Sequence, residues 1–158
     1  YQLGNSSLKW SNVYCNYLDG ISVASLYADL AERYEADKFY VPGTIVTIGG
    51  DAEVTAATLN DDVFGVVSTN TSYLMNSKAG TDATHPPIAL VGRVPVRVQG
   101  TISKGQKLVV GPLGVAVRYV PVGEEGEPPL NQDKLVGRAL ADKYDEKEGL
   151  VEVVLAAH

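Results

Sequence analysis

His85 is the only internal histidine of the 158-residue chain, and hydroxyl and carboxyl side chains accompany it in one polar stretch. Ser72, Ser77 and Asp82 are the nearest candidates for a nucleophile and an orienting group. A serine hydrolase needs such a nucleophile, base and orienting group to meet in space. No recognisable nucleophile motif surrounds these residues, so we predict no catalytic residue among them.

Two pairs of adjacent carboxylates invite comparison with glycoside hydrolases, which use two carboxyl groups at a controlled separation. The pairs are Asp61-Asp62 and Glu124-Glu125. Neighbouring side chains on a strand point to opposite faces and cannot flank one glycosidic bond. Solvated loop charge therefore accounts for both pairs better than catalysis does.

The sequence carries no pattern for a cofactor, a metal ion or a phosphate group. The stretch Gly49-Gly50-Asp51 lacks the lysine and the following helix of a phosphate-binding loop. Cys15 is the only cysteine, which excludes an intrachain disulfide and a multi-cysteine metal site. We therefore predict no cofactor and no metal, and we expect the chain not to be an enzyme.

The charge balance argues against nucleic acid and membranes as partners. Thirteen basic and nineteen acidic residues give a net charge of -6, which attracts neither nucleic acid nor an anionic membrane. No apolar run is long enough to span a bilayer, so we expect no membrane insertion. Residues 83–118 contain no acidic residue and five basic ones: Arg93, Arg97, Lys104, Lys107 and Arg118. Ion pairs between these basic side chains and carboxylates of the same chain are the simpler account, and ion pairs between subunits are the alternative.

Residues 88–98 (Ile-Ala-Leu-Val-Gly-Arg-Val-Pro-Val-Arg-Val) show the two-residue alternation of a half-buried strand. Apolar side chains and a glycine occupy the even positions, whereas Arg93, Pro95 and Arg97 lie on the odd ones. One face therefore belongs to a core. Proline cannot donate a ladder hydrogen bond. We therefore expect either that this strand lies at a sheet edge, or that the nitrogen of Pro95 points to a place where no hydrogen-bond partner is required.

Two copies of one pattern flank this strand. Residues 43–68 and 105–140 each contain a turn glycine, a short apolar strand, a glycine turn, a second strand, a polar connection and a strand with a glycine. The 16 glycines and 8 prolines favour short strands joined by tight turns. We predict a mainly β chain, a pseudo-duplicated small β-barrel or sandwich; chance similarity between two β-rich halves is the alternative.

One short helix is predicted over residues 25–36. Leu26, Leu30 and Tyr34 recur every four residues there, which is the spacing of a helical stripe. We expect this helix to pack across an open end of the β unit.

Residues 69–87 form the longest irregular stretch of the chain. Loops of this length in a compact domain are usually functional or packed against a partner. We therefore predict a candidate ligand loop, in which side chains suited to a sugar or another polar ligand are Tyr73, Asn76 and His85.

Residues 1–20 carry apolar side chains on both sides of an extended chain. Val13, Cys15 and Tyr17 lie on one side, and Tyr14 and Leu18 lie on the other. Twenty residues cannot cover both sides alone. We therefore predict a short β segment or collar over residues 1–22 before a β-rich head of residues 23–158. The residues predicted at its subunit contact are Leu3, Leu8, Trp10, Val13, Tyr14 and Tyr17.

Three stretches carry a resemblance to a known group. Residues 3–14 (Leu-Gly-Asn-Ser-Ser-Leu-Lys-Trp-Ser-Asn-Val-Tyr), followed by an Asp19-Gly20 turn, resemble an element found near the ends of tail fibres and tailspikes of tailed bacteriophages. Ala-Asp-Leu-Ala-Glu at residues 28–32 and Gly-Val-Val-Ser at residues 65–68 are similar to the C-terminal fibre domains related to the autoproteolytic, chaperone-like maturation domains of phage tailspikes. No self-cleavage dyad aligns with this chain, so the resemblance carries no catalysis over.

The resemblance implies a homotrimeric virion protein of a tail fibre, assembled in the host cytoplasm, with other tail or fibre proteins as further partners. Our preferred hypothesis is a structural module that trimerises, caps the fibre end and contributes to host attachment. Two alternatives stay open: a self-cleaving maturation domain, and a head that binds bacterial surface polysaccharide. Because the chain begins at Tyr1 and not at Met, we expect it to be a piece of a longer protein.

Overall fold

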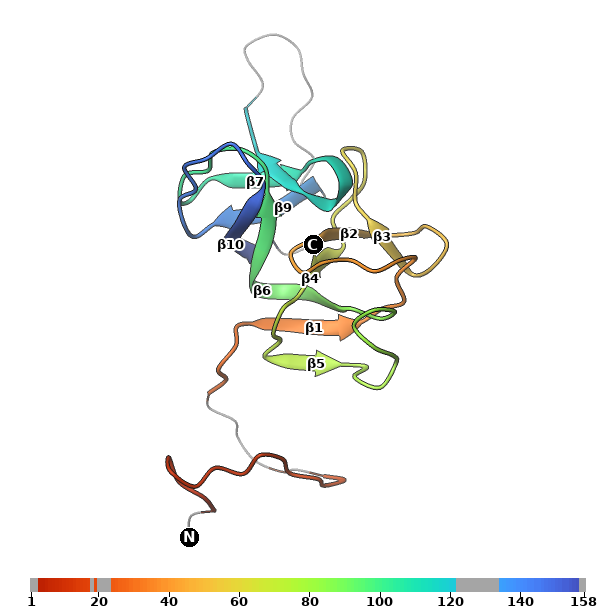
Figure 1. Ribbon diagram of the computed structural model, residues 1–158, viewed down its shortest axis with the longest axis vertical. Coiled ribbons are helices and arrows are strands. Elements are labelled where there is room, and N and C mark those ends of the chain that lie inside the picture. Colours follow the sequence, from red (N-terminus) through yellow and green to blue (C-terminus); the bar gives the residue numbers. More distant parts are fainter. Residues whose placement is uncertain (1–2, 18, 20–23, 122–133, 157–158) are drawn as a thin grey trace.

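Strands build almost all of the regular structure in the computed structural model, which describes residues 3–17, 19, 24–121 and 134–156 (Figure 1). The prediction of a mainly β chain is confirmed. The strands are β1 (Asp29–Arg33), β2 (Ile45–Ile48), β3 (Val54–Ala56), β4 (Gly65–Val67), β5 (Tyr73–Met75), β6 (Pro87–Val98), β7 (Lys107–Val110), β8 (Ala116–Arg118), β9 (Leu135–Ala139) and β10 (Gly149–Leu155), with one 3-10 turn, η1 (Pro112–Gly114). No helix in these described ranges has the length and hydropathy needed to cross a bilayer.

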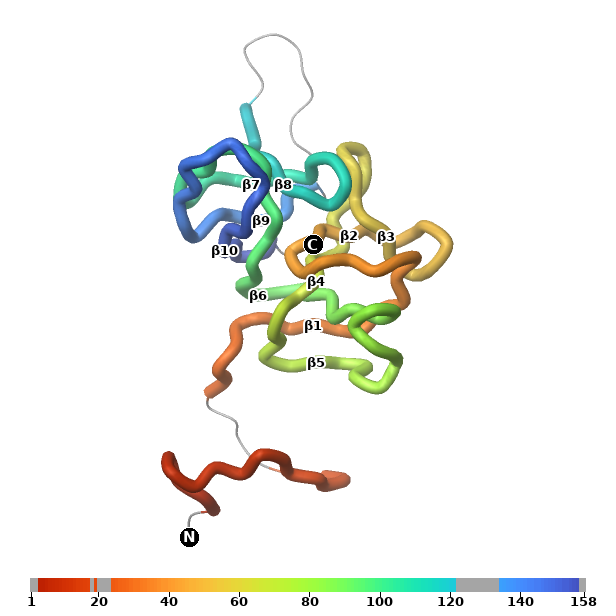
Figure 2. The backbone as a smooth tube through the Cα atoms, in the orientation of Figure 1, coloured from red at the N-terminus to blue at the C-terminus, as the bar shows by residue number. Residues whose placement is uncertain are grey.

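The long strand β6 belongs to two groups of strands (Figure 2). Its second half pairs with β10 and β8, and β9 and β7 complete a closed five-stranded barrel. Its first half pairs with β1 and β4, and β2 and β3 follow. A parallel bridge between Ala36 and Val54 links β3 to the residues that follow β1.

The two groups follow the same pairing plan, which confirms the predicted pseudo-duplication. β1, β2, β3, β4 and β6 of the first unit correspond to β6, β7, β8, β9 and β10 of the second. In each unit the second strand pairs with the third and the fourth, the fourth pairs with the fifth, and the fifth pairs with the first. The third strand makes a parallel contact with the first strand in the second unit, and with Ala36, just after the first strand, in the first unit. β6 therefore closes the first unit and opens the second.

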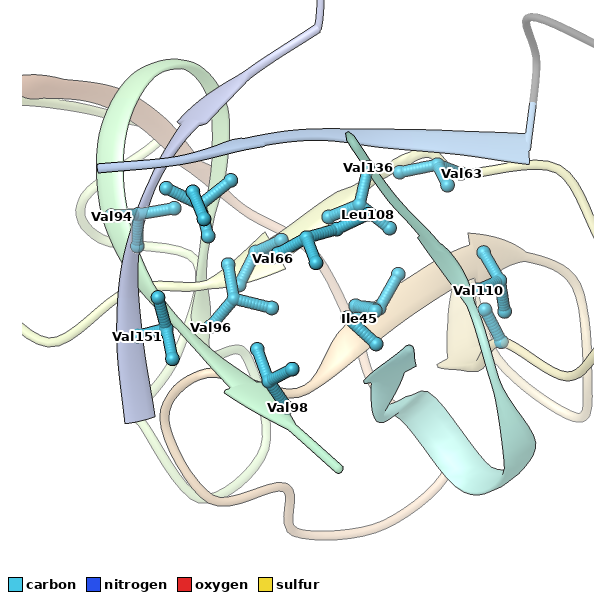
Figure 3. Packing of buried hydrophobic residues seen from close by; sticks show 14 of the residues in the cluster. Ile45, Val63, Val66, Val94, Val96, Val98, Leu108, Val110, Val136 and Val151 are labelled. Atoms are coloured by element: carbon cyan, nitrogen blue, oxygen red, sulfur yellow. The ribbon is translucent and has the colours of Figure 1, made fainter. Parts of the chain in front are cut away.

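Alternation along the strands builds two hydrophobic clusters. Val94, Val96 and Val98 of β6 point into the larger one, together with Leu108 and Val136 of the second unit (Figure 3). Ile45 and Val66 join this cluster from the first unit, whereas their neighbours Val46 and Val67 point the other way into a second cluster. Full burial of each such side chain contributes about 1.5–3 kcal/mol. The two units are therefore fused through a shared core.

The predicted alternation of β6 holds in its second half and fails in its first. Ile88 and Ala89 are adjacent, yet both are fully buried. Ile88 packs in the second cluster and Ala89 in the larger one, because this part of the strand lies between the two. A strand covered on both faces carries an apolar run, and the alternation is lost.

Gly92 is the point at which β6 passes from one unit to the other. Its φ is +111°, and a Cβ atom there would lie 2.2 Å from the carbonyl oxygen of Ala28. The pairing with β1 skips one residue just before it, between Val91 and Ala89. Such a bulge next to a glycine bends a strand and ends one ladder before another begins.

Pro95 lies where its missing N–H group has no ladder partner. Its cross-strand neighbour in β10 is Glu152. The N–H groups of Arg93 and Arg97 point away from β10, to the carbonyl oxygens of Ala28 and Gly43. The nitrogen of residue 95 lies on that same side, so the prediction that no partner is required there is confirmed.

The helix predicted over residues 25–36 is wrong. These residues enter β1, whose Asp29 and Ala31 are buried while Leu30 faces outward. Tyr34 does pack inward, with its ring centroid 4.9 Å from that of Phe64. Pairing of β1 with β5 and β6 overrides the helical propensity of the stretch. The loop of residues 69–87 likewise contains a strand, β5, which runs parallel to β1.

Residues 3–17 form no strand within the single chain in the part that is described. Their one regular feature is a turn in which the backbone groups of Asn5 and Leu8 bond each other, at 3.1 and 3.2 Å. The β collar and the boundary between residues 22 and 23 stay predictions, and residues 20–23 lie outside the described ranges. Residues 122–133, which include the Glu124-Glu125 pair, also lie outside the described ranges.

Gly92→Ala should destabilise the protein by about 3 kcal/mol or more, because the new methyl group meets a backbone carbonyl and the residue keeps a positive φ. Gly105→Ala is the matched control, since Gly105 has a φ of +85° but open space around its Cβ position. It should cost only about 1 kcal/mol. Urea unfolding measures both, and equal losses would show that the close approach at Gly92 is unimportant.

Candidate interaction surface

The six residues predicted at the subunit contact are all uncovered in the single chain. Their exposed fractions run from 62% for Trp10 to 92% for Tyr14. The other four, all 66–81% exposed, are Leu3, Leu8, Val13 and Tyr17. Soluble proteins seldom expose so many large apolar side chains together unless they bind a partner.

A second uncovered apolar surface lies on the head, where β5, β1 and β6 run side by side (Figure 1). Leu30 of β1 is in register with Tyr73 of β5 and Val91 of β6. All three side chains point outward and are 38–66% exposed. We call this row of three residues the strip. Beyond Tyr73 the sheet ends, since β5 pairs only with β1 among the described strands.

A hollow of about 320 Å³ lies beside the segment that leads into β1. It contains two charged side chains, Arg93 and Glu152, and no ion pair is found between them or to any other described residue. The residues that line it come from the link before β1, the loop after β4, the middle of β6 and β10: Leu26, Tyr27, Ala28, Thr69, Asn70, Arg93, Pro95 and Glu152. We call the strip and this hollow together the docking face.

Two motifs that carry the phage resemblance meet beneath this face. Asp29, from residues 28–32, and Ser68, from residues 65–68, are both buried, and the Ser68 hydroxyl donates to the Asp29 carboxylate at 2.5 Å. The backbone N–H of Ser72 donates to the Asp29 carbonyl oxygen at 2.9 Å. A charge-assisted hydrogen bond offsets part of the cost of burying the carboxylate. The pair therefore fixes β1 to the end of β4.

Arg33 organises the predicted ligand loop, a role that no sequence pattern indicated. Its Nη1 donates to the carbonyl oxygen of His85 at 2.6 Å, and its Nη2 lies 2.8 Å from Asp82 Oδ1. The Asn76 side chain donates to the Arg33 carbonyl oxygen at 3.2 Å. Asn76 and His85 are thus gathered around Arg33, whereas Tyr73 lies on the strip. Ligand binding by this loop stays a prediction.

The side chains considered for hydrolysis have separate partners. Ser72 Oγ donates to Ser25 Oγ at 2.6 Å, the His85 ring lies 3.1 Å from Thr84 Oγ1, and Asp82 pairs with Arg33. The Asp61 carboxylate accepts hydrogen bonds from the hydroxyl and the backbone N–H of Thr58, which lower its pKa. Glu124 and Glu125 lie outside the described residues. The described residues contain no cluster of three or more His, Cys, Asp or Glu that could hold a metal ion.

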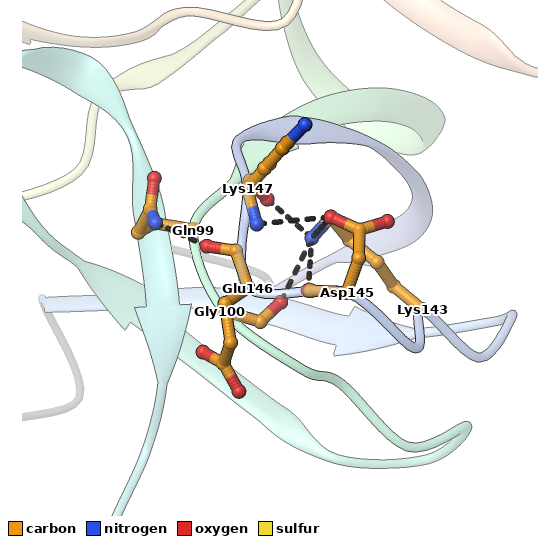
Figure 4. A network of polar contacts seen from close by, with 6 residues as sticks. All are labelled: Gln99, Gly100, Lys143, Asp145, Glu146 and Lys147. Carbon is orange, nitrogen blue, oxygen red and sulfur yellow. Dashed lines mark hydrogen bonds and ion pairs between the residues drawn. The ribbon is translucent and has the colours of Figure 1, made fainter.

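Lys143 is a buried cation in the turn between β9 and β10. Its Nζ donates to the carbonyl oxygens of Gly100 at 3.0 Å, Asp145 at 2.6 Å and Lys147, and to the Asp145 carboxylate at 3.0 Å (Figure 4). The hydrogen bond from Lys143 is the main cause of the lowered pKa of Asp145. All donors of the ammonium group are engaged, so it fixes this turn to the end of β6.

Only some of the five basic side chains in residues 83–118 have a partner among the described residues. Arg97 Nε pairs with Glu148 at 2.6 Å, and Lys107 lies 5.9 Å from the ring centroid of Tyr119. Arg93 and Arg118 have no ion pair among the described residues. Pairing within the fold therefore accounts for Arg97 but not for the whole set.

Solved structures share this fold, although no family model and no curated protein sequence matches the chain. The C-terminal fragment of gene product 12 of bacteriophage phi29 has a TM-score of 0.51 and 16% identity, over 81% of this chain and 100% of the fragment. Pre-mature gene product 12 of the same phage has a TM-score of 0.54 and 15% identity, over 87% of this chain. This chain spans only 23% of that longer protein.

The N base of the phi29 head fibre gp8.5 is a weaker match, with a TM-score of 0.46 and 15% identity over 80% of this chain and 93% of the base. At such identities the similarity to gene product 12 shows a shared fold and nothing finer. What is confirmed of the expected resemblance is a fold shared with a phage protein. Membership of the maturation-domain group is not shown.

Arg33→Gln should release the loop of residues 69–87 and cost about 2 kcal/mol, because it removes a charge-assisted bond and an ion pair. Lys78 lies exposed in this loop, so trypsin should cleave after it faster in the variant. Arg93→Gln, which breaks no ion pair among the described residues, is the control. Mass spectrometry of the digests measures the rates, and equal cleavage in all three proteins would contradict the role of Arg33.

The pKa of the Tyr34 phenol predicts that the protein loses stability at alkaline pH. Burial first, and then its hydrogen bond to Glu32 at 2.9 Å, raise its pKa from 10.0 to about 12. The folded state therefore holds this proton more tightly, a contribution that is full below pH 10 and is lost as the pH rises towards 12. Tyr34→Phe should flatten the fall in the urea midpoint over this range. Tyr144→Phe is the comparison: the hydrogen bond to Asp142 also raises the pKa of this phenol, but without burial, so the fall should flatten much less than in Tyr34→Phe.

Proposed function

We propose that this chain is a structural module of a bacteriophage tail fibre, a virion protein that trimerises through residues 3–17 and caps the fibre end. The observation that carries the proposal is the run of six uncovered apolar side chains ahead of a head whose fold is shared with a phage protein. Full burial of each such side chain contributes about 1.5–3 kcal/mol, so three copies together gain enough to offset the entropy lost on association.

The mechanism is mechanical. Cyclic symmetry places the same segment of each copy around one axis, and each copy then covers apolar side chains and strand edges that a single copy exposes. This contact sets the register of the three chains during assembly and opposes their unfolding afterwards. Other tail or fibre proteins are the further partners, and Asn76 and His85 of the loop of residues 69–87 offer hydrogen-bonding groups to host polysaccharide during attachment.

A second candidate is a self-cleaving maturation domain. Its motivation is that the structural neighbours are pre-mature gene product 12 of phi29 and a C-terminal fragment of the same gene product. The mass of the product of the intact gene separates the two candidates: one full-length species supports the structural module, and two species support cleavage.

Trp10→Ala should weaken the oligomer by about tenfold or more, because buried tryptophans dominate interfaces of this kind. Tyr144→Ala, at a residue that is 86% exposed in the turn between β9 and β10, is the control and should have no effect. Light scattering or analytical ultracentrifugation over a dilution series gives the oligomer mass. An unchanged mass for Trp10→Ala at all concentrations would show that residues 3–17 are not the subunit contact.

A further inference from the structure

The docking face and the segment of residues 3–17 are both uncovered, and they lie at the same end of the molecule. Figure 1 shows the N-terminal segment beyond β5 and β1, on the side away from the five-stranded barrel. The chain runs from this segment through Leu26 and Tyr27, which line the hollow, directly into β1, which carries Leu30 of the strip. In an assembly around one axis, the segment of each copy can therefore reach the docking face of a neighbour.

The segment needs cover on two sides. Val13, Cys15 and Tyr17 alternate with Tyr14 and therefore lie on the opposite side of the extended chain. A partner that covers one side leaves the other side exposed. Contact among three sister segments covers the side that faces the axis. The outward side then needs a different surface.

We propose that the docking face of one copy binds the outward side of residues 10–17 of a second copy. This inference rests on the proposed function and names the partner surface of the same contact. The aromatic side chains of the segment lie along the strip, and one ring enters the hollow.

The chemistry of the two surfaces is complementary. The strip offers Tyr73, Leu30 and Val91 in one row across three strands, a flat apolar surface suited to aromatic rings. At the hollow, Arg93 offers a cation to a ring face, and Asn70 offers an amide to a tyrosine hydroxyl. The open edge of β5 adds unpaired backbone groups, which an extended segment can join as a further strand.

The single native cysteine provides a direct test. Cys15 is exposed within the segment, and Thr69 and Asn70 are exposed at the hollow. Thr69→Cys and Asn70→Cys each create a second thiol. It can form a disulfide with Cys15 only if the Cα atoms of the two cysteines come within about 7 Å of each other. Tyr144→Cys, an exposed position outside the docking face, is the matched control, and Cys15→Ser in each background removes the native partner.

After mild oxidation, we expect covalent dimers and trimers for Thr69→Cys or Asn70→Cys on a non-reducing gel, at least fivefold above those of Tyr144→Cys and lost with Cys15→Ser. A trimer in solution without such bridges in either variant would overturn the docking face and leave the proposed function standing. A bridge within one chain would also overturn it, and the mass of the oxidised product separates that case. A monomer under all conditions would overturn both.

A double-mutant cycle tests the same contact without a covalent bond. Tyr17 lies on the same side of the segment as Cys15. Leu30→Ser and Tyr17→Ala should each weaken the oligomer, and together they should weaken it by at least fivefold less than the product of the two separate effects. Leu59→Ser, at a residue that is 60% exposed outside the docking face, should combine with Tyr17→Ala independently. Independent effects for Leu30→Ser would contradict direct packing of the segment on the strip.

Discussion

The close approach of Gly92 to the carbonyl oxygen of Ala28 is the constraint on which the architecture depends. β6 can bend at this point and exchange one set of partners for another only because no side chain stands there. The bend lets one strand end the first unit and begin the second. The buried pair of Asp29 and Ser68 lies beside this point and holds β1 against the adjoining strands.

Much of the fold was predictable because it follows from alternation and turn residues. The alternation that places Val94, Val96 and Val98 on one face, together with the repeated order of glycines and short strands, indicated a duplicated β unit around residues 88–98. All three valines are buried. The helix predicted over residues 25–36 failed because its stripe of spacing four coincides with a short strand pattern. Only pairing with β5 and β6, strands distant in the sequence, decides between the two.

The uncovered apolar surfaces were predictable only in part. The exposure in residues 3–17 was expected because their apolar side chains exceed what a short segment can bury. The strip on the head was not, since Leu30, Tyr73 and Val91 come from three separate strands and become neighbours only in the folded sheet. Arg33 and Lys143 escaped prediction for a similar reason: their partners are mostly backbone carbonyl oxygens, whose positions the residue types do not reveal.

The shared strand makes this protein different from one with two domains joined by a flexible linker. No linker separates the units, so neither can swing or rotate while the other stays still. Neither can be excised by a protease as an intact piece, because cutting β6 would remove a wall from both. A pulling force applied to one unit is carried by the continuous backbone of β6 straight into the next. In an extended appendage, that continuity transmits load without a hinge.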